Sequence, residues 1–355
     1  MSARVRAFTY NRQRLGDPAG TASAALTAVV AVYSAHPTAP LALAARTGSM
    51  TAAEFRALET KRAAVRIPGM RGSAFLAPTE SAAMVFASAR LSAAQVAKRL
   101  QRGGMDAARY ASAADRVVAA AATPRLPREL EEAAGVSGME MSVLLRTLRF
   151  DGRLVARAEG SLRAANLRWV ATEAWVPGAL EVADPDAAAV ALARAYLSGY
   201  GPARVADFTW WTGLPKGVAA RALVEVDTID VGEGLLLHRG DEAAFGSVPA
   251  VRNTVDLLPK WDAYTMGHAP DGRRRFIHPD NQPLAYVRKG VVAPGQPNIG
   301  LPGDGYPVVL VGGEAVGTWS VSLKGATYHL FDSAGEAVRR RIEERLASVE
   351  ALLSS

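Results

Sequence analysis

The sequence predicts a mostly helical α+β protein, in which tandem winged helix-turn-helix units are followed by a small C-terminal β-barrel. Twice, three helix-forming segments precede a short two-stranded ribbon, which is the element order of a winged helix-turn-helix. After about residue 248 short alternating strands lie between Gly, Pro and Asp clusters, a pattern typical of an all-β domain. We expect winged-helix units at 1–110, 111–180 and 181–245, the barrel at 246–334 and a final helix at 335–355.

The N-terminal unit has the least regular pattern of the three. Small apolar residues over 22–34 predict a helix that ends before Pro37, because proline interrupts a helix interior. Thr51 and Glu54 have the spacing of a capping box, so a helix is expected to begin there. Residues 63–78 then predict a turn and a short strand.

The second unit shows its element order most clearly. The expected elements are a helix from 112, a helix starting at Pro127, a turn at 135–138, a helix over 139–150, and strands at 153–157 and 166–170. The third unit repeats this order over 187–238. Its expected elements are a helix to Gly199, a helix from Arg204, a turn at 213–215, a third helix and a ribbon over 228–238.

The C-terminal region predicts strands and then one helix. Residues 308–322 predict a hairpin that turns at Gly312 and Gly313. Further strands are expected at 274–279, 284–292 and 326–331, and an amphipathic helix at 335–353.

Composition limits the protein class. Of the 355 residues, 49% are hydrophobic and 21% charged, which fits a globular protein, and the net charge of +7 favours a polyanionic partner. The absence of cysteine excludes disulfides, thiolate zinc sites and cysteine nucleophiles. Because no apolar run has the length of a signal peptide or a membrane span, we expect a cytoplasmic, nucleoid-associated protein without membrane contact.

Five segments, in order, resemble the winged-helix family that includes the AlkZ and YcaQ DNA glycosylases; they are 29–46, 70–78, 196–215, 257–268 and 315–321. The resemblance covers nearly the whole chain. It implies a monofunctional glycosylase that excises alkylated or crosslinked bases from double-stranded DNA and needs no metal or nucleotide cofactor. We expect it to act as a monomer.

The sequence departs from the family at the expected catalytic segment. In the family the end of the first helix carries Gln, an apolar residue, then Gln or Asp, which hold the attacking water and the oxocarbenium-like sugar. Without a gap the corresponding pair is Tyr33 and Ala35, whereas a one-residue slip gives Ser34 and His36. We expect His36 to activate the water, with Ser34 or Tyr33 beside it. The alternative is that these polar residues merely end a helix.

Arginines of the second unit predict DNA contacts. At the end of its third helix and on its ribbon they can fork onto phosphates or enter a minor groove; they are Arg149, Arg153, Arg157, Arg163 and Arg168. Arg71, in the Met-Arg-Gly turn, predicts either a phosphate contact or a structural ion pair. Asp262, in a loop that the resemblance places near the active site, predicts either a cleft residue or a turn cap.

Other polar and aromatic residues have simpler interpretations. Trp210 and Trp211 are expected in the core, and His268 and His278 have no third ligand nearby at metal spacing, so no metal site is expected. Two alternatives to a glycosylase stay open. One is a non-catalytic DNA-binding protein, a damage sensor on the same scaffold, and the other is a transcription regulator.

Overall fold

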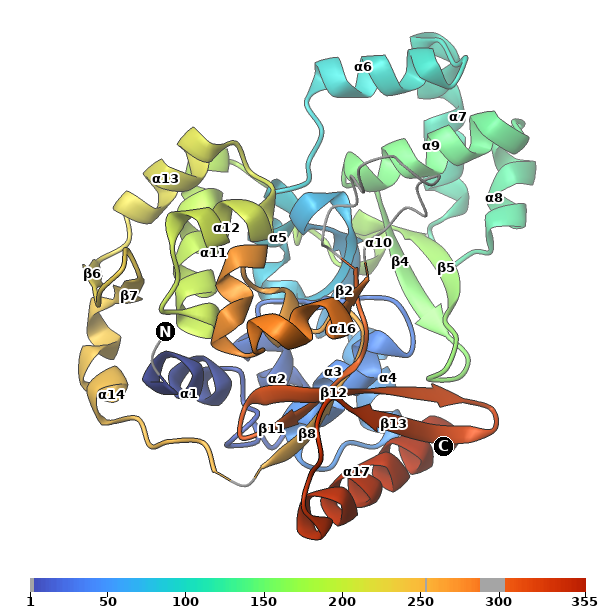
Figure 1. Cartoon of the computed structure of the whole chain (residues 1–355). Helices are drawn as coiled ribbons and strands as arrows, with labels where there is room; N and C mark the ends of the chain where they lie inside the picture. Colours follow the sequence, from blue (N-terminus) through green and yellow to red (C-terminus); the bar gives the residue numbers. More distant parts are fainter. Residues whose placement is uncertain (1–2, 253, 288–303) are drawn as a thin grey trace, which may run out of the picture.

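The computed structural model describes residues 3–252, 254–287 and 304–355 (Figure 1). Its N-terminal part contains α1 (Ala3–Arg12), α2 (Ala22–Ala28), β1 (Val32–Tyr33), α3 (Thr38–Thr47), α4 (Ala52–Thr60), β2 (Ala64–Pro68), β3 (Ala74–Pro78) and α5 (Ala82–Ala87). The capping box of α4 is confirmed: Thr51 Oγ1 accepts from the Glu54 amide, and the Glu54 carboxylate accepts from the Thr51 amide.

Two N-terminal expectations are wrong. The helix expected over 22–34 ends at Ala28, because the β-branched residues after it favour extended backbone and Val30 has a φ of +67°. Strand β1 takes the place of its last turn. The segment 63–78 forms a two-stranded hairpin, β2 and β3, around a turn at Met70–Gly72.

The second part follows the predicted order, with α6 (Ala93–Arg102), α7 (Ala107–Ala120), α8 (Pro127–Ala134), α9 (Gly138–Phe150), β4 (Leu154–Glu159), β5 (Asn166–Ala171) and α10 (Thr172–Trp175). Leu100 and Met105 are buried in one core with α7, α8 and α9, so α6 packs with this part. Strand β4 also pairs with β2, where Arg66 lies opposite Ala156. The result is one five-stranded antiparallel sheet of order β1-β3-β2-β4-β5.

The third part also has the predicted order. It consists of α11 (Pro185–Tyr200), α12 (Val205–Thr212), α13 (Lys216–Val224), β6 (Thr228–Asp230) and β7 (Leu236–His238), followed by α14 (Glu242–Ser247). Gly213 ends α12 with a φ of +74°, a conformation that glycine adopts without strain. Its helices pack on α5 and on the apolar face of β2, in the largest core of the protein.

The C-terminal part contains β8 (Val255–Leu258), α15 (Ala263–Met266), α16 (Gln282–Ala285), β9 (Tyr286–Val287), β10 (Asp304–Gly305), β11 (Val308–Val311), β12 (Glu314–Ser322), β13 (Gly325–Leu330) and α17 (Glu336–Ser354). The hairpin at Gly312 and Gly313 and the final helix are confirmed. The described strands do not form a closed barrel: β8, β11, β12 and β13 make an open sheet, which α17 covers (Figure 1).

The strand expected at 274–279 is wrong as well, because 3₁₀ turns occupy Pro270–Arg275 and Pro279–Asn281. Arg275 of this segment is buried and donates to the distant carbonyl of Pro202, a contact that the local sequence does not reveal. Most of the strand expected at 284–292 lies outside the described residues. No helix in the part of the chain that the structure describes is long and apolar enough to cross a membrane.

Candidate functional site

Six aromatic side chains from distant segments line a cavity of about 260 Å³, together with Arg71. We call this cavity the aromatic pocket. Its rings belong to β1, β3, α11, α12 and the loop after β8; they are Tyr33, Phe75, Tyr200, Trp210, Trp211 and Trp261. The expectation that both tryptophans of α12 lie in the core holds for Trp211, whereas Trp210 is only half-buried.

Tyr33 contacts two other rings of the aromatic pocket. It lies opposite Phe75 in the β1–β3 pairing, and their ring centroids are 6.0 Å apart in an edge-to-face arrangement. The Trp261 ring is 4.5 Å from the Tyr33 ring, tilted by 54°. On the other wall, the guanidinium carbon of Arg71 lies 4.5 Å from the centre of the Trp210 ring. The pocket therefore offers aromatic faces and a cation to a flat ligand.

Two residues that line the aromatic pocket have strained backbone. Arg71 has a φ of +55° and Trp261 a φ of +60°, in the left-handed region that side chains other than Gly and Asn rarely adopt. Such strain is maintained only when the surrounding structure imposes it, and it gathers at functional sites. Gly213 permits the approach of Arg71, since an added Cβ there would lie 3.1 Å from Arg71 Cγ.

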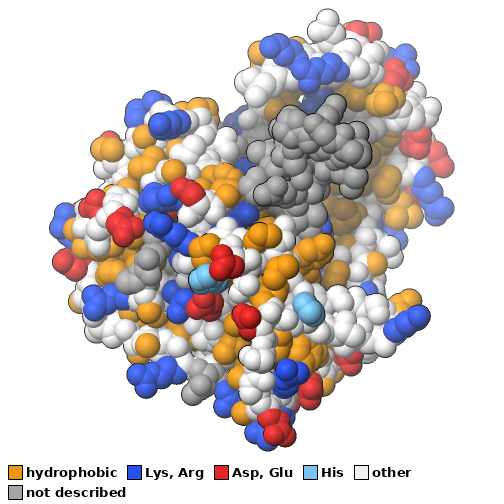
Figure 2. Space-filling view, in the orientation of Figure 1, with side chains coloured by type: hydrophobic (Ala, Val, Ile, Leu, Met, Phe, Trp, Pro, Cys, Tyr) orange, Lys and Arg blue, Asp and Glu red, His pale blue; other side chains and the backbone are white. Residues whose placement is uncertain are grey.

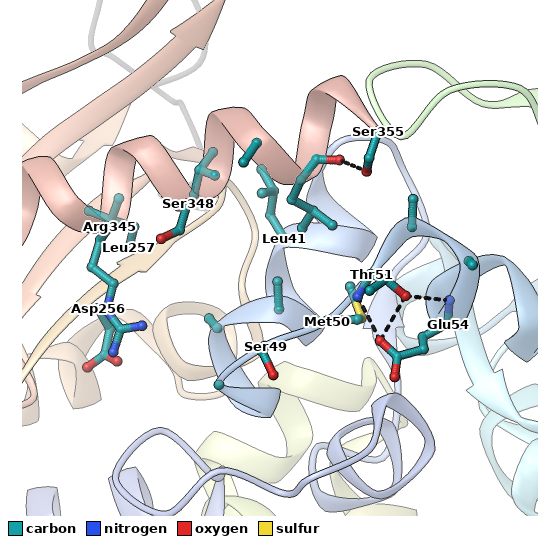
Figure 3. Close-up of a pocket in the computed structure, with 18 of the residues that line it drawn as sticks. Leu41, Ser49, Met50, Thr51, Glu54, Asp256, Leu257, Arg345, Ser348 and Ser355 are labelled. Carbon is teal, nitrogen blue, oxygen red and sulfur yellow. Dashed lines mark hydrogen bonds between the residues drawn. The ribbon is translucent and has the colours of Figure 1, made fainter.

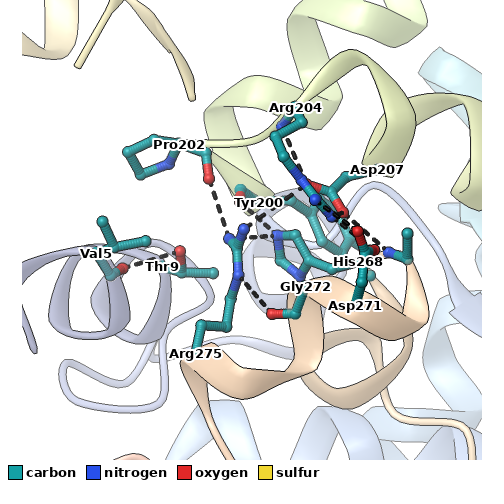
Figure 4. Close-up of polar contacts among 12 residues, drawn as sticks. Val5, Thr9, Tyr200, Pro202, Arg204, Asp207, His268, Asp271, Gly272 and Arg275 are labelled. Atoms are coloured by element: carbon teal, nitrogen blue, oxygen red, sulfur yellow. Dashed lines mark hydrogen bonds and ion pairs between the residues drawn. The ribbon is translucent and has the colours of Figure 1, made fainter. Parts of the chain in front are cut away.

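A buried polar network supports the wall that Tyr200 forms (Figure 4). Arg275 Nη1 lies 2.7 Å from His268 Nε2 and also donates to the carbonyl of Pro202. Burial, followed by the positive charge of Arg275, lowers the pKa of His268 to about 3, and the same Nε2 also lies 3.0 Å from the carbonyl oxygen of Tyr200. Asp207 accepts from both Arg204 and the Ala269 amide. The network joins the end of α11 to the residues after α15.

His36 does not line the aromatic pocket. Its Nε2 lies 2.9 Å from Arg66 Nη2 and its Nδ1 lies 3.2 Å from the carbonyl of Ser161, so both ring nitrogens are occupied. Burial, followed by the charge of Arg66, lowers the pKa of His36 to about 4. In this arrangement the Nε2 lone pair faces a guanidinium and not the aromatic pocket, so the geometry gives no support to His36 as a base, and that role stays a prediction.

Ser34 belongs to the same structural network. Its backbone carbonyl accepts from Arg66 Nη1, and its side chain is buried. Arg66 forms a bidentate ion pair with Glu59, at 2.8 and 3.0 Å, and Glu59 also accepts from the Ala158 amide of β4. The network thus joins the N-terminal part to the two-stranded ribbon formed by β4 and β5. Of the three expected catalytic residues, only Tyr33 lies in the aromatic pocket.

Asp262 does not face a cleft. Its side chain is fully buried and forms a bidentate ion pair with Arg46, with N–O distances of 2.7 and 2.8 Å. It also accepts from the Tyr264 amide and so caps α15. The turn-cap alternative therefore describes Asp262 correctly. The buried ion pair of Asp262 with Arg46 holds the neighbouring Trp261 in position.

A larger cavity of about 850 Å³ lies between α17 and the α3–α4 region (Figure 3). Its lining is mainly apolar, and several of its polar groups have structural partners. Thr51 and Glu54 bond to each other in the capping box, and Asp256 accepts a 2.5 Å hydrogen bond from Tyr10. Burial raises the pKa of Asp256 to about 6.

The ribbon arginines have polar partners within the protein. Arg153 pairs with Asp115 at 2.7 Å, Arg168 with Glu159 at 2.6 Å, and Arg157 with Glu159 at 3.7 Å. Arg163 donates to the carbonyl of Ser322. Two carboxylates, Asp115 and Glu159, are thus the partners of three of these four arginines, and phosphate contacts by the ribbon stay a prediction.

The other two predicted DNA-binding arginines differ from the ribbon. Arg71 stacks on Trp210 in the aromatic pocket, and Arg149 stacks on Trp169 at 4.8 Å. Sequence reasoning missed Arg99 and Arg146, which lie near Arg149. It also missed the pocket roles of Trp261 and Phe75, although the positions of both were within segments carrying the family resemblance.

Comparison with known proteins identifies the family. The family described as DNA glycosylase AlkZ-like matches residues 26–352. No curated protein matches the sequence. Among solved structures, the DNA glycosylase AlkZ of Streptomyces sahachiroi has the same fold, with a TM-score of 0.77, 17% sequence identity, and coverage of 99% of this chain and 96% of that chain. The family match extends over nearly the whole sequence, and the chain therefore belongs to the AlkZ-like DNA glycosylase family.

Proposed function

We propose that this protein is a monofunctional DNA glycosylase that holds an extruded base in the aromatic pocket. Enzymes that act on a base in duplex DNA take it out of the stack and bind it between aromatic or apolar side chains. The observation that supports the proposal is the position of Tyr33. It is one of the residues that correspond to the family's catalytic pair, and it lines a cavity walled by aromatic rings.

The lining of the aromatic pocket favours a particular leaving group. Among its described lining residues there is no Asp, Glu or His that would protonate a departing base. A neutral base is a poor leaving group without protonation, whereas an alkylated purine that already carries a positive charge departs readily. The aromatic faces also attract a cationic ring. We therefore assign alkylated, positively charged purines as the substrate class.

Tyr33 is the residue that we assign to the chemistry. In the proposed reaction its hydroxyl orients the attacking water toward the sugar. The electron-rich faces of Tyr33 and Trp261 stabilise positive charge that develops on the sugar as the bond breaks. Hydrolysis consumes the water and yields the free base and an abasic site. No metal or nucleotide cofactor takes part in this reaction.

The remaining parts of the chain provide binding. The parts at 107–171 and 185–238 have the element order of winged-helix units, and we assign them to duplex DNA binding. The protein acts as a monomer on chromosomal DNA in the cytoplasm, on alkylated or crosslinked sites.

One observation favours a second candidate, a damage-binding protein without catalysis. The family's Gln-x-Gln or Gln-x-Asp pair is absent here, where the ungapped register gives Tyr33 and Ala35 and the slipped register gives Ser34 and His36. Incubation with a duplex that carries N7-methylguanine, followed by alkaline cleavage at abasic sites, separates the two candidates. A glycosylase produces cut strands above the level without enzyme, and a sensor binds the duplex without cutting.

A further inference from the structure

We propose that a second site, the arginine groove, binds phosphate groups of the DNA backbone beside the aromatic pocket. The arginine groove is a cavity of about 360 Å³ whose lining includes Gly72, Arg146, Arg149 and Trp169, with Arg99 close to it. The inference rests on the proposed function, because it assigns the backbone contact of the same DNA strand.

The two arginines that line the groove and the adjacent Arg99 have no carboxylate partner in the described part of the chain. Among residues 3–252, 254–287 and 304–355, no carboxylate forms an ion pair with Arg99, Arg146 or Arg149. Burial, followed by the like charge of Arg146, lowers the pKa of Arg99 and of Arg149. Three positive charges thus lie near one another, and no described carboxylate pairs with them. The ribbon arginines differ, since three of them have carboxylate partners.

Aromatic rings hold these guanidinium groups in place. The guanidinium carbons of Arg99 and Arg146 lie 4.7 and 5.9 Å from the centre of the Phe150 ring, and that of Arg149 lies 4.8 Å from the Trp169 ring. Stacking orients a guanidinium and leaves its N–H groups available.

An orphaned donor also points to a ligand. The Nη1 of Arg99 is buried, and among the residues that the structure describes it has no hydrogen-bond partner. A buried unsatisfied donor of this kind is costly unless a ligand or water accepts from it. Phosphate oxygens are suitable acceptors, because the planar fork of arginine matches their geometry.

One segment separates the arginine groove from the aromatic pocket. Arg71 and Ser73 line the aromatic pocket, whereas Gly72 and Ala74 line the arginine groove. Alternate residues of this turn therefore face two cavities. A strand whose base occupies the pocket passes its phosphates across the turn, toward the groove.

The charge continues onto the adjoining surface. Helix α6 carries Lys98 and Arg102 in addition to Arg99, and both side chains are exposed. Figure 2 shows blue side chains gathered over α6 at the top of the molecule. This arrangement fits a polyanion longer than a single phosphate, and DNA is such a polyanion.

Two triple variants with equal loss of charge test the inference. The groove variant is Arg99→Gln, Arg146→Gln and Arg149→Gln, and the control is Arg153→Gln, Arg157→Gln and Arg168→Gln. Binding to an undamaged fluorescent duplex is measured by anisotropy across a salt series. The groove variant should bind at least ~10-fold more weakly and lower the slope of log K against log salt by about 2–3, whereas the control changes binding less than ~3-fold.

Other outcomes of these binding measurements would contradict the inference. Equal losses in the two variants would show that only net charge matters, and unchanged binding by the groove variant would exclude the site. If the triple groove variant does not fold, the exposed Arg146 is changed alone to Gln; a loss of about 3-fold supports the groove, and no loss contradicts it. Because undamaged DNA is used, a wild type that binds through the groove but excises nothing refutes the glycosylase proposal and leaves the groove intact.

Discussion

The Tyr33 ring lies 4.5 Å from the Trp261 ring, so the N-terminal and C-terminal parts of the chain meet in one wall of the aromatic pocket. Trp261 reaches this position with a strained backbone, and the ion pair of the adjacent Asp262 with Arg46 fixes it there. Neither part of the chain forms the pocket alone. The expected activity consequently depends on the complete fold.

Tyr33→Phe tests the role of the hydroxyl. The variant retains the ring contacts with Phe75 and Trp261 but lacks the group that orients the water. We expect single-turnover excision of N7-methylguanine to fall about 10²-fold, while duplex affinity stays within ~2-fold. A variant that excises at the wild-type rate would remove the hydroxyl from the mechanism.

His36→Gln tests whether the imidazole is a base. Glutamine has a donor for the Ser161 carbonyl and an acceptor for Arg66, so it preserves the hydrogen bonds of His36. We expect the excision rate to remain within a few-fold of the wild type. A loss of ~10²–10⁴-fold in a folded variant would instead show that His36 activates the water.

His36 should also make stability depend on pH. Its pKa is about 4 in the folded protein and near 6.5 when unfolded, so the unfolded chain binds more protons between these values. The free energy of unfolding therefore falls as pH decreases from about 6.5 to 4, by on the order of 3 kcal/mol for this group. Urea unfolding at several pH values should show a shallower dependence for His36→Gln; an identical dependence would contradict the assigned environment.

Asp262→Asn should destabilise the protein strongly. It leaves the fully buried Arg46 without its counter-charge, which typically costs about 3–5 kcal/mol. Asp271→Asn is the matched control, because Asp271 pairs with Arg204 while its side chain is 70% exposed, and such pairs contribute about 0–1 kcal/mol. Thermal unfolding measures both. Similar shifts for the two variants would show that Asp262 is not the structural anchor described.

Local sequence signals predicted much of the fold. The helices and ribbons of the second and third parts, the capping box at Thr51 and the glycine turn at 312–313 are encoded by neighbouring residues. The open C-terminal sheet and the turns at 270–281 were not predicted. There, Arg275 is buried by Pro202 and His268, and contacts of this kind leave no periodic pattern in the sequence.

The candidate site was predicted only in part. The family resemblance identified the segment that contains Tyr33. Because two alignment registers were possible, Ser34 and His36 were also candidates for the catalytic role. Tertiary contacts distinguish them, because Arg66 takes the Ser34 carbonyl and the His36 ring into a structural network. The arginines show the same limit. The sequence shows how many arginines there are. Only the folded structure shows which of them pair with a carboxylate.

The release of free N7-methylguanine from duplex DNA tests the central claim most directly. The wild type and Trp261→Ala are compared with a reaction without enzyme, because this base also leaves spontaneously, and the free base is quantified by chromatography. We predict release by the wild type well above the spontaneous level, and a loss of at least ~10-fold in Trp261→Ala with duplex binding retained. Release at the spontaneous level by a wild type that binds the duplex would contradict the assignment as a glycosylase.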